Sequence, residues 1–284
     1  QANLVCKVGK LHMYETAAQR AAAAAARKLQ SERGIAFEDL DRDAAQALVP
    51  QLGETIFGGT FFPDVCHCLD PLAMVRAYAD LFQRRGGVLL CEEVRGFEVG
   101  PEGAEYILTN AGAHAVETVV VAVGAWSRDL VRPLGSKVPV ETERGYHVML
   151  PEPGIELPVP VKAEGRGIIM TPMKSGLRIT GIAEFGGLEA PPDTRRFEQI
   201  LNHARAVLPG LICNNRSEWM GHRPSTPDSL PILDRSPRFP NVFYAFGHGH
   251  FGLGLGAISG RLVAELVTGA PPIVDPRPYR ASRF

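Results

Sequence analysis

The chain has 284 residues, 45% of them hydrophobic and 21% charged, which is enough apolar material for a large core. At this length we expect about two domains. The formal net charge of −1 at pH 7, without any run of lysine or arginine, provides no basic surface for nucleic acid, so small molecules are the expected ligands.

Cysteine use and hydropathy indicate the compartment. The five cysteines are odd in number and scattered, which is typical of reduced thiols. No apolar stretch is expected to approach the roughly 20 residues that a membrane-spanning helix needs, and the N-terminus shows no signal-peptide pattern. We therefore expect a soluble cytoplasmic protein without a membrane-spanning segment.

The chain begins with a predicted strand and a long helix. Residues 7–15 alternate as a strand, and residues 16–34 predict a single alanine-rich helix. Thr16 and Gln19 have the spacing of a capping box, and Gly34 is placed to end the helix. This part of the chain is predicted to be structural.

The "CHC" sequence at Cys66, His67 and Cys68 is the one local cluster of metal-binding residue types. A metal site would need a further Cys or His pair, and no such pair is evident. Neighbouring residues on a strand also point to opposite faces. We therefore predict ordinary packing here and no metal site.

A second helix and a group of strands follow. Asp70 is predicted as the N-cap of this helix and Pro71 as part of its first turn. The last strand of the group is a continuous apolar run, typical of a strand buried on both faces. The predicted strands are 88–94, 94–100, 105–110 and 118–124.

The end of the last of these strands is a candidate ligand site. Gly124 lies at its carboxyl edge, and Ser127 is placed to cap a following helical turn. Such edges bind ligands in open α/β sheets. A plain strand-to-helix turn is the alternative.

Residues 137–150 and 167–185 alternate between polar and apolar residues as in an antiparallel sheet. A helix over 194–210 follows them. We expect this part to form a separate layer that faces the substrate.

Near the C-terminus, Gly247, Gly249 and Gly252 have GxGxxG spacing between a strand-like and a helix-like run. A dinucleotide fingerprint also requires a second parallel strand that ends in an acidic residue. The segment after the helix contains Pro271, Pro272, Pro276 and Pro278, which exclude a central strand. The glycine loop therefore serves some other purpose than holding a pyrophosphate.

Several motifs together carry a family resemblance. They are "VVVAVGAWS", "LRITGIAEF", "WMGHRPSTPDSLPIL" and "NVFYAFGHGHFGLGLGAISGRLVAELVTG". In this order they resemble the FAD-dependent D-amino acid oxidoreductase family, and within it the bacterial D-amino acid dehydrogenases and glycine oxidases.

The resemblance implies an α/β fold with an α+β second domain, in which a partial FAD-binding Rossmann-like domain is interleaved with an antiparallel-sheet substrate domain. The substrate domain would comprise residues 1–69 and 137–218, and the FAD-binding domain residues 70–136 and 219–284. Family members carry the FAD pyrophosphate on an N-terminal βαβ unit that these residues do not include. We therefore expect an N-terminally incomplete chain that needs this segment or a partner subunit.

The resemblance also implies FAD as cofactor and hydride transfer from the α-carbon of an amino acid as the reaction. Arg223 matches the family's anchor for the substrate carboxylate, and a guanidinium can grip a carboxylate with two hydrogen bonds. Tyr146 and His248 or His250 would line the substrate, although a core position is an equal alternative for Tyr146. Where glycine oxidases have a substrate-binding tyrosine, this chain has Ile169.

Cofactor contacts implied by the family are mainly backbone contacts, since a flat ring approaches closely where side chains are absent. They are Val94, Gly124, Trp126, Gly247, His248, Gly249, His250, Phe251, Gly252 and Gly254. A sarcosine or other secondary-amine oxidoreductase shares this scaffold and is one alternative. An inactive fragment or subunit that needs a partner for FAD binding is another, and peripheral contact with the inner membrane is left open.

Overall fold

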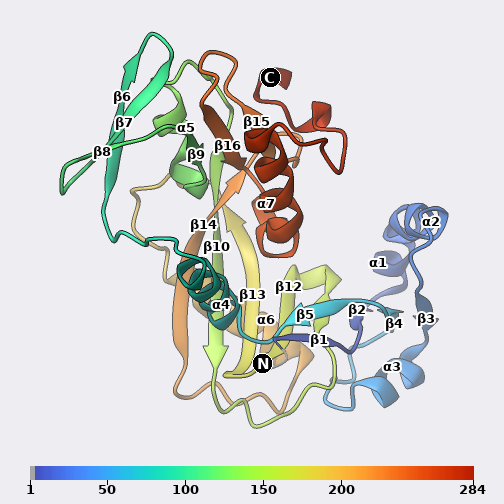
Figure 1. Ribbon diagram of the computed structural model, residues 1–284. Coiled ribbons are helices and arrows are strands. Elements are labelled where there is room, and N and C mark those ends of the chain that lie inside the picture. Colours follow the sequence, from blue (N-terminus) through green and yellow to red (C-terminus); the bar gives the residue numbers. More distant parts are fainter. Residues whose placement is uncertain (1–3) are drawn as a thin grey trace. The chain divides into compact units, whose positions relative to one another are not determined.

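The structure is a computed structural model that describes residues 4–284 (Figure 1). It is a mixed α/β protein with several sheets, as the sequence predicted. Two compact units are each built from separate stretches of chain. Unit 1 contains the residues up to Gly87, Gly145–Ala183 and Pro192–Met220, and unit 2 contains Val88–Arg144, Glu184–Pro191 and Gly221–Phe284.

The predicted division differs from these units at several boundaries. Residues 70–87, which the resemblance assigns to the FAD-binding part, cluster with unit 1. Residues 137–144, assigned to the substrate part, cluster with unit 2. The assignment of either unit to cofactor or substrate stays a prediction.

An eight-stranded sheet with the order β14-β10-β13-β12-β11-β2-β4-β3 contains most of the strands of unit 1. The first residues of β10 (141–144), the last residue of β13 (184) and the last residues of β14 (221–225) cluster with unit 2. β11 runs parallel to β2, whereas β12 pairs antiparallel with both β11 and β13. The strands are β2 (Lys10–Tyr14), β3 (Glu38–Leu40), β4 (Gly58–Phe62), β10 (Glu141–Leu150), β11 (Val161–Ala163), β12 (Ile168–Met173), β13 (Gly176–Glu184) and β14 (Ser217–Ser225).

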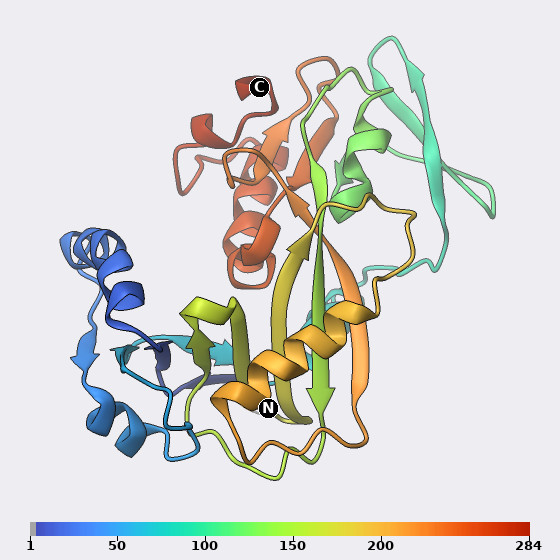
Figure 2. The same cartoon turned by 180° about the vertical axis from the view of Figure 1, so that it is seen from behind.

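Helix α6 (Arg195–Val207) covers one face of this sheet, and Figure 2 shows it lying across the strands. Its apolar stripe includes Phe197, Ile200 and Leu201, all buried. Alternate residues of β10, such as Val148 and Leu150, pack in the same core. The helix predicted over 194–210 is therefore confirmed, and it fixes which face of the sheet is the core.

The N-terminal part of unit 1 consists of short elements. The predicted single helix over 16–34 is wrong, because it is broken at Ala23. Neither half buries a residue, so no packing holds the alanine run in one piece. The Thr16 cap is confirmed: the Gln19 amide donates to Thr16 Oγ1 at 3.2 Å. The elements are β1 (Val5–Lys7), α1 (Ala17–Ala22), α2 (Ala24–Glu32), α3 (Arg42–Leu48), β5 (Cys66–Cys68) and η2 (Glu164–Arg166).

Helix α4 (Pro71–Arg84) begins as the sequence predicted. Asp70 Oδ1 accepts a hydrogen bond from the Ala73 amide at 2.9 Å, and Pro71 occupies the first turn. No residue of α4 is buried, and its large apolar side chains, which include Leu72, Val75 and Tyr78, are exposed. The described residues thus leave the apolar face of an amphipathic helix without a cover.

Unit 2 contains two three-stranded sheets. In the first, of order β15-β16-β9, β16 runs parallel to β9. The second is a meander of order β6-β7-β8. The elements are β6 (Val94–Gly100), β7 (Gly103–Thr109), β8 (Ala113–Ala115), β9 (Val119–Val121), η1 (Gly124–Trp126), α5 (Ser127–Val131), β15 (Ile232–Arg235), β16 (Val242–Phe246), η3 (Gly249–Phe251), α7 (Gly252–Thr268), η4 (Arg277–Tyr279) and η5 (Ala281–Arg283).

Two strand predictions in unit 2 are corrected. Residues 88–93 form no strand, and Val88, Leu89 and Leu90 are exposed. Within the apolar run predicted as a strand over 118–124, only the residues of β9 form a strand. Val120, at the centre of β9, is 43% exposed. Both runs have the composition of buried strands, but the described residues supply no neighbour for these surfaces.

Residues Gly249–Thr268 form one helical stretch that is long and apolar enough to cross a membrane, with a mean hydropathy of 1.3. The expectation that no apolar stretch approaches this length is therefore corrected. Leu262 and Val263 of α7 pack against Leu233 and Phe243 of the sheet, but only 17% of the apolar stretch is buried. One such helix is weak evidence for a span, and the location of the protein in the cell stays a prediction.

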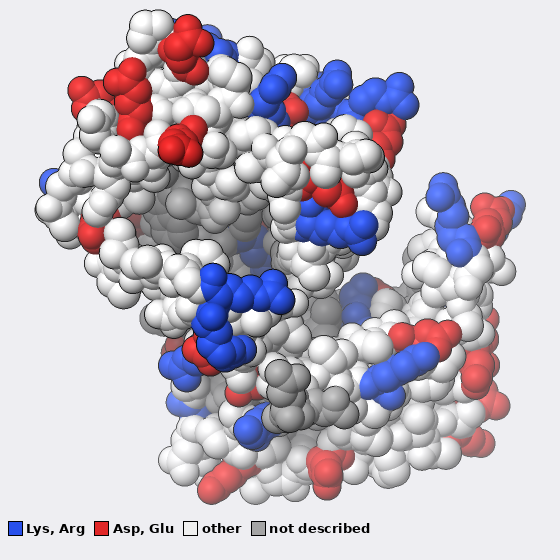
Figure 3. Space-filling view, in the orientation of Figure 1, with Lys and Arg blue, Asp and Glu red and all other residues white. Residues whose placement is uncertain are grey.

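Charged side chains of both signs are interspersed over the face of the molecule in Figure 3. This distribution agrees with the formal net charge of −1.

A partly buried ion cluster in unit 1 is expected to make its stability pH-dependent. Glu164 lies 2.8 Å from His12 Nδ1 and 2.9 Å from Lys162 Nζ. Burial alone would raise the pKa of Glu164, but the hydrogen bonds from His12 and Lys162 outweigh it and lower the pKa from 4.5 to about 2. The carboxylate therefore stabilises the fold above pH 4.5, and this contribution is lost as the pH falls toward 2.

We expect Glu164→Gln to lower the free energy of unfolding at neutral pH by up to about 3 kcal/mol, with a smaller difference near pH 3. Urea unfolding of both proteins across this range measures it. A difference that stays constant from pH 7 to pH 3 would show that the charge of Glu164 does not contribute.

Candidate functional site

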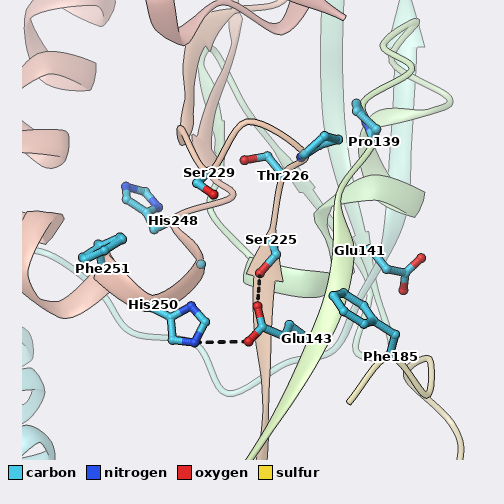
Figure 4. A pocket seen from close by; sticks show the side chains of 12 residues that line it. Pro139, Glu141, Glu143, Phe185, Ser225, Thr226, Ser229, His248, His250 and Phe251 are labelled. Carbon is cyan, nitrogen blue, oxygen red and sulfur yellow. Dashed lines mark hydrogen bonds and ion pairs between the residues drawn. The ribbon is translucent and has the colours of Figure 1, made fainter. Parts of the chain in front are cut away.

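A pocket of about 390 Å³ lies within unit 2. Three stretches of chain that are distant in sequence form its wall, namely the start of β10, the end of β14 and the glycine loop that follows β16. Phe185 closes one side (Figure 4). The lining residues are Pro139, Glu141, Glu143, Phe185, Ser225, Thr226, Pro227, Ser229, His248, Gly249, His250 and Phe251.

Glu143 is the centre of the polar contacts in this pocket. Its Oε1 atom lies 3.1 Å from His250 Nε2 and 3.4 Å from Arg223 Nη1, and its Oε2 atom accepts a hydrogen bond from Ser225 Oγ at 3.2 Å. The side chain is only 13% exposed. One carboxylate thus joins a guanidinium, an imidazole and a hydroxyl. Figure 4 shows its contacts with His250 and Ser225.

Arg223 lies on β14, two residues before Ser225 and therefore on the same face of that strand. Its side chain is 24% exposed. Burial lowers the pKa of Arg223 and the Glu143 carboxylate opposes this shift, so the guanidinium keeps its charge. Arg223 lies beside the pocket, where it contacts the lining residue Glu143. Its role as a carboxylate anchor stays a prediction.

The glycine loop turns the chain from β16 into α7. Gly247 and Gly249 have φ values of +83° and +51°, in the left-handed region that favours glycine. His248 between them forms a hydrogen bond with Ser259 Oγ at 2.9 Å, and burial lowers its pKa, so the imidazole is neutral at pH 7. At Gly254 a Cβ atom would meet nothing within 4 Å. The surface of the first turns of α7 is therefore not covered by other protein atoms at Gly254.

The turn after β9 also contains predicted cofactor residues. Gly124 has a φ of +59°, and the Trp126 ring stands edge-on to His222 at 5.4 Å. Ser127 is fully buried and makes no capping bond, so the predicted cap is wrong. The 3-10 turn η1 runs directly into α5, so Trp126 occupies the N-cap position and Ser127 is the first residue of the helix. Val94 lies at the exposed beginning of β6.

Tyr146 is a core residue, which corrects the expectation that it lines the substrate. Its side chain is fully buried, its ring packs against Phe197 of α6 at 5.3 Å, and its hydroxyl accepts a hydrogen bond from the Asp193 amide. All three residues belong to unit 1. Tyr146 is two residues before Val148 on β10, so both side chains point to the face of the sheet that α6 covers.

The "CHC" segment forms β5 and pairs antiparallel with β1. His67 Nε2 hydrogen-bonds the Pro172 carbonyl at 3.0 Å, so the imidazole is engaged with the backbone. Within residues 4–284 no group of three or more Cys, His, Asp or Glu side chains could hold a metal ion.

Sequence reasoning did not find Glu143 and Ser225. Alternation along β10 puts Glu141 and Glu143 on one face, which is a usable signal for a polar site. The partners of Glu143 come from residues 80 or more positions away, which alternation does not reveal.

Comparison with known proteins identifies the family. The sequence pattern of the FAD dependent oxidoreductases (DAO) matches residues 3–266. The chain is 33% identical to a D-amino-acid oxidase of Bradyrhizobium diazoefficiens over 90% of its own length and 62% of the relative, and 30% identical to a D-amino acid dehydrogenase of Sinorhizobium medicae over 97% of its length and 67% of the relative. It thus spans less than two thirds of the length of the first of these relatives.

Solved structures agree with this fold. Glycine oxidase from Geobacillus kaustophilus superposes with a TM-score of 0.87 at 25% identity, covering 99% of this chain and 76% of that one. L-proline dehydrogenase from P. horikoshii gives a TM-score of 0.84 at 21% identity, covering 99% of this chain and 77% of that one. The glycine loop, the turn at Gly124 and the match over residues 3–266 lead to one conclusion: the chain belongs to the DAO family of FAD-dependent oxidoreductases.

Proposed function

We propose that this protein oxidises an amino acid, a D-amino acid or one as small as glycine, by transfer of the α-hydrogen as hydride to FAD. The observation that carries the proposal is the pocket beside the glycine loop, in which the lining residues Glu143 and His250 meet and Glu143 also contacts Arg223 at 3.4 Å. A D-amino-acid oxidase and a D-amino acid dehydrogenase among the relatives support this substrate class. Oxidation of secondary amines such as sarcosine is the alternative within the same chemistry.

The residues of unit 2 fit a flavin at the start of α7. Gly254 leaves space beside the helix, and the first amides of α7 present the positive end of a helix of 17 residues. Trp126 and Phe251 offer exposed aromatic surface. When bound there, FAD supplies the acceptor for the hydride.

The residues of the chain would then bind and orient the substrate. Arg223 can hold the substrate carboxylate with two parallel hydrogen bonds, which fixes the α-carbon relative to the glycine loop. His248 is neutral and engaged with Ser259, so it shapes the wall and carries no charge. The neighbouring Phe251 excludes water from one side of the pocket.

We further propose that polypeptide outside these 284 residues completes the flavin site and binds the pyrophosphate. Two separate observations support this. The segment Val88, Leu89 and Leu90 has the composition of a buried strand but is exposed, and helix α4 buries none of its apolar residues. The covering polypeptide would be a further part of the same protein or a partner subunit.

The cofactor site is tested by filling the space beside α7. We expect Gly254→Leu to weaken FAD binding at least about tenfold while leaving the fold intact, because a Cβ atom at this position meets nothing within 4 Å and leucine favours the helix. FAD titration followed by the visible flavin spectrum measures the affinity. Gly260→Leu is the matched control, since a Cβ there also meets nothing within 4 Å but lies farther along the helix.

Equal FAD affinity in the Gly254 and Gly260 variants would contradict the placement of the flavin at the start of α7. The reaction itself is tested by a screen of the FAD-loaded protein with D-amino acids, glycine and sarcosine, coupled to an artificial electron acceptor. Turnover of sarcosine well above that of every primary amino acid would favour the secondary-amine alternative.

A further inference from the structure

The Glu143 carboxylate lies beside Arg223, the proposed anchor for the substrate carboxylate. An isolated guanidinium in a pocket attracts any small carboxylate, whether or not it carries an amino group. Here the guanidinium of Arg223 lies beside the pocket, 3.4 Å from the carboxylate of the lining residue Glu143. A cation and an anion therefore lie side by side at the edge of the pocket, which is a different recognition surface from a cation alone.

The contacts of Glu143 hold its carboxylate in place. Ser225 donates to Oε2 at 3.2 Å, and His250 Nε2 lies 3.1 Å from Oε1. Both partners are lining residues of the pocket, as is Glu143 itself. Phe185 and Phe251 also line the pocket and add apolar surface to it, and a charge beside apolar surface is less screened than one in water. The negative charge is thus fixed at the pocket wall.

The neighbouring Glu141 differs although it lines the same pocket. Its carboxylate pairs with Arg128 at 3.2 Å, and half of its side chain is exposed. Figure 4 shows the Glu143 carboxylate pointing toward Ser225 and His250, whereas the Glu141 carboxylate points away from them. Two acidic residues on one strand therefore offer a test residue and a matched control.

We propose that Glu143 is the specificity residue that selects substrates carrying a positively charged amino group, by binding that group while Arg223 binds the carboxylate. The inference rests on the proposed function for the role of Arg223. A ligand with both groups satisfies the ion pair at both ends. A plain carboxylate competes with Glu143 for Arg223 and brings no cation to replace the lost contact.

Glycine and acetate test this inference because they differ by the amino group alone. Both are titrated into the flavin-free 284-residue chain, and the dissociation constants are read from ligand-detected NMR. We expect the wild-type chain to bind glycine at least about tenfold more tightly than acetate, the size of effect that one charged hydrogen bond gives. In Glu143→Gln we expect acetate to bind more tightly than in the wild type and glycine more weakly, so that the preference reverses. Glu141→Gln is expected to leave the preference unchanged.

Equal affinity of the wild-type chain for glycine and acetate, or no binding of either, would overturn the inference without any variant. A Glu143→Gln chain that keeps the wild-type ratio of the two affinities would also overturn it, and the wild-type comparison stands even where this variant does not fold. The readout needs no flavin and no turnover. Failure of the redox proposal alone would therefore leave the binding preference intact, and the two failures are distinguishable.

Discussion

Replacing Arg223 with lysine is expected to lower kcat/KM for the amino acid substrate of the FAD-loaded protein by about 100-fold. Lysine keeps the positive charge but loses the planar fork that holds a carboxylate with two hydrogen bonds. It also has a shorter reach toward Glu143, which Arg223 contacts at 3.4 Å. Steady-state kinetics over a range of substrate concentrations measure the change.

Arg261→Lys is the control for this prediction. Arg261 lies on α7 in unit 2, is largely exposed and forms an i,i+4 pair with Glu265 that lysine can also form. Its kcat/KM is expected to stay within about twofold of the wild-type value, since such pairs contribute little. Unchanged kcat/KM in Arg223→Lys would refute the anchor role.

Arg144→Ala is expected to destabilise the protein by about 3–5 kcal/mol, because it removes one partner of a buried ion pair. Arg144 is 1% exposed, and its Nε atom lies 3.4 Å from Glu184 Oε2. Its Nη2 atom also donates to the Pro191 carbonyl at 2.7 Å. Loss of the side chain removes the ion pair with Glu184 and releases the backbone of the 184–191 segment, which belongs to unit 2 with Arg144.

The free energy of unfolding from urea titration, followed by far-ultraviolet circular dichroism, measures this cost. Arg128→Ala removes an exposed arginine that pairs with Glu141, and it is expected to cost less than about 1 kcal/mol. Equal costs for the two variants would show that burial does not amplify the Arg144 interaction.

Local chemistry made parts of this fold predictable. Asp70 and Pro71 determine where α4 begins, because a cap bonds to an amide three residues away and needs no distant partner. Thr16 marks the start of α1 for the same reason. The ordered motifs around Gly124, Arg223 and Gly247 indicated the family, since each combines a backbone requirement with a chemical one.

The wrong predictions concern properties that depend on residues far away in the sequence. Alternation along β10 assigns Tyr146 to one face and Glu143 to the other, but it does not reveal that α6 covers the face of Tyr146. The residues around Val120 look like a strand buried on both sides, yet burial requires a neighbour that the described residues do not provide. Ser127 has the residue type of a cap, but a 3-10 turn precedes it and occupies that position.

The parallel pairing of β9 with β16 has a consequence for how the protein is made. β9 is an edge strand of its sheet, and its one neighbour in the described order is β16, close to the C-terminal end of the chain. On a ribosome, β9 therefore emerges on the order of ten seconds before its partner has been synthesised. During that interval Val119, Val120 and Val121 are an unpaired apolar strand, so folding of unit 2 is expected to wait until β16 has been synthesised and to depend on chaperones that shield such segments.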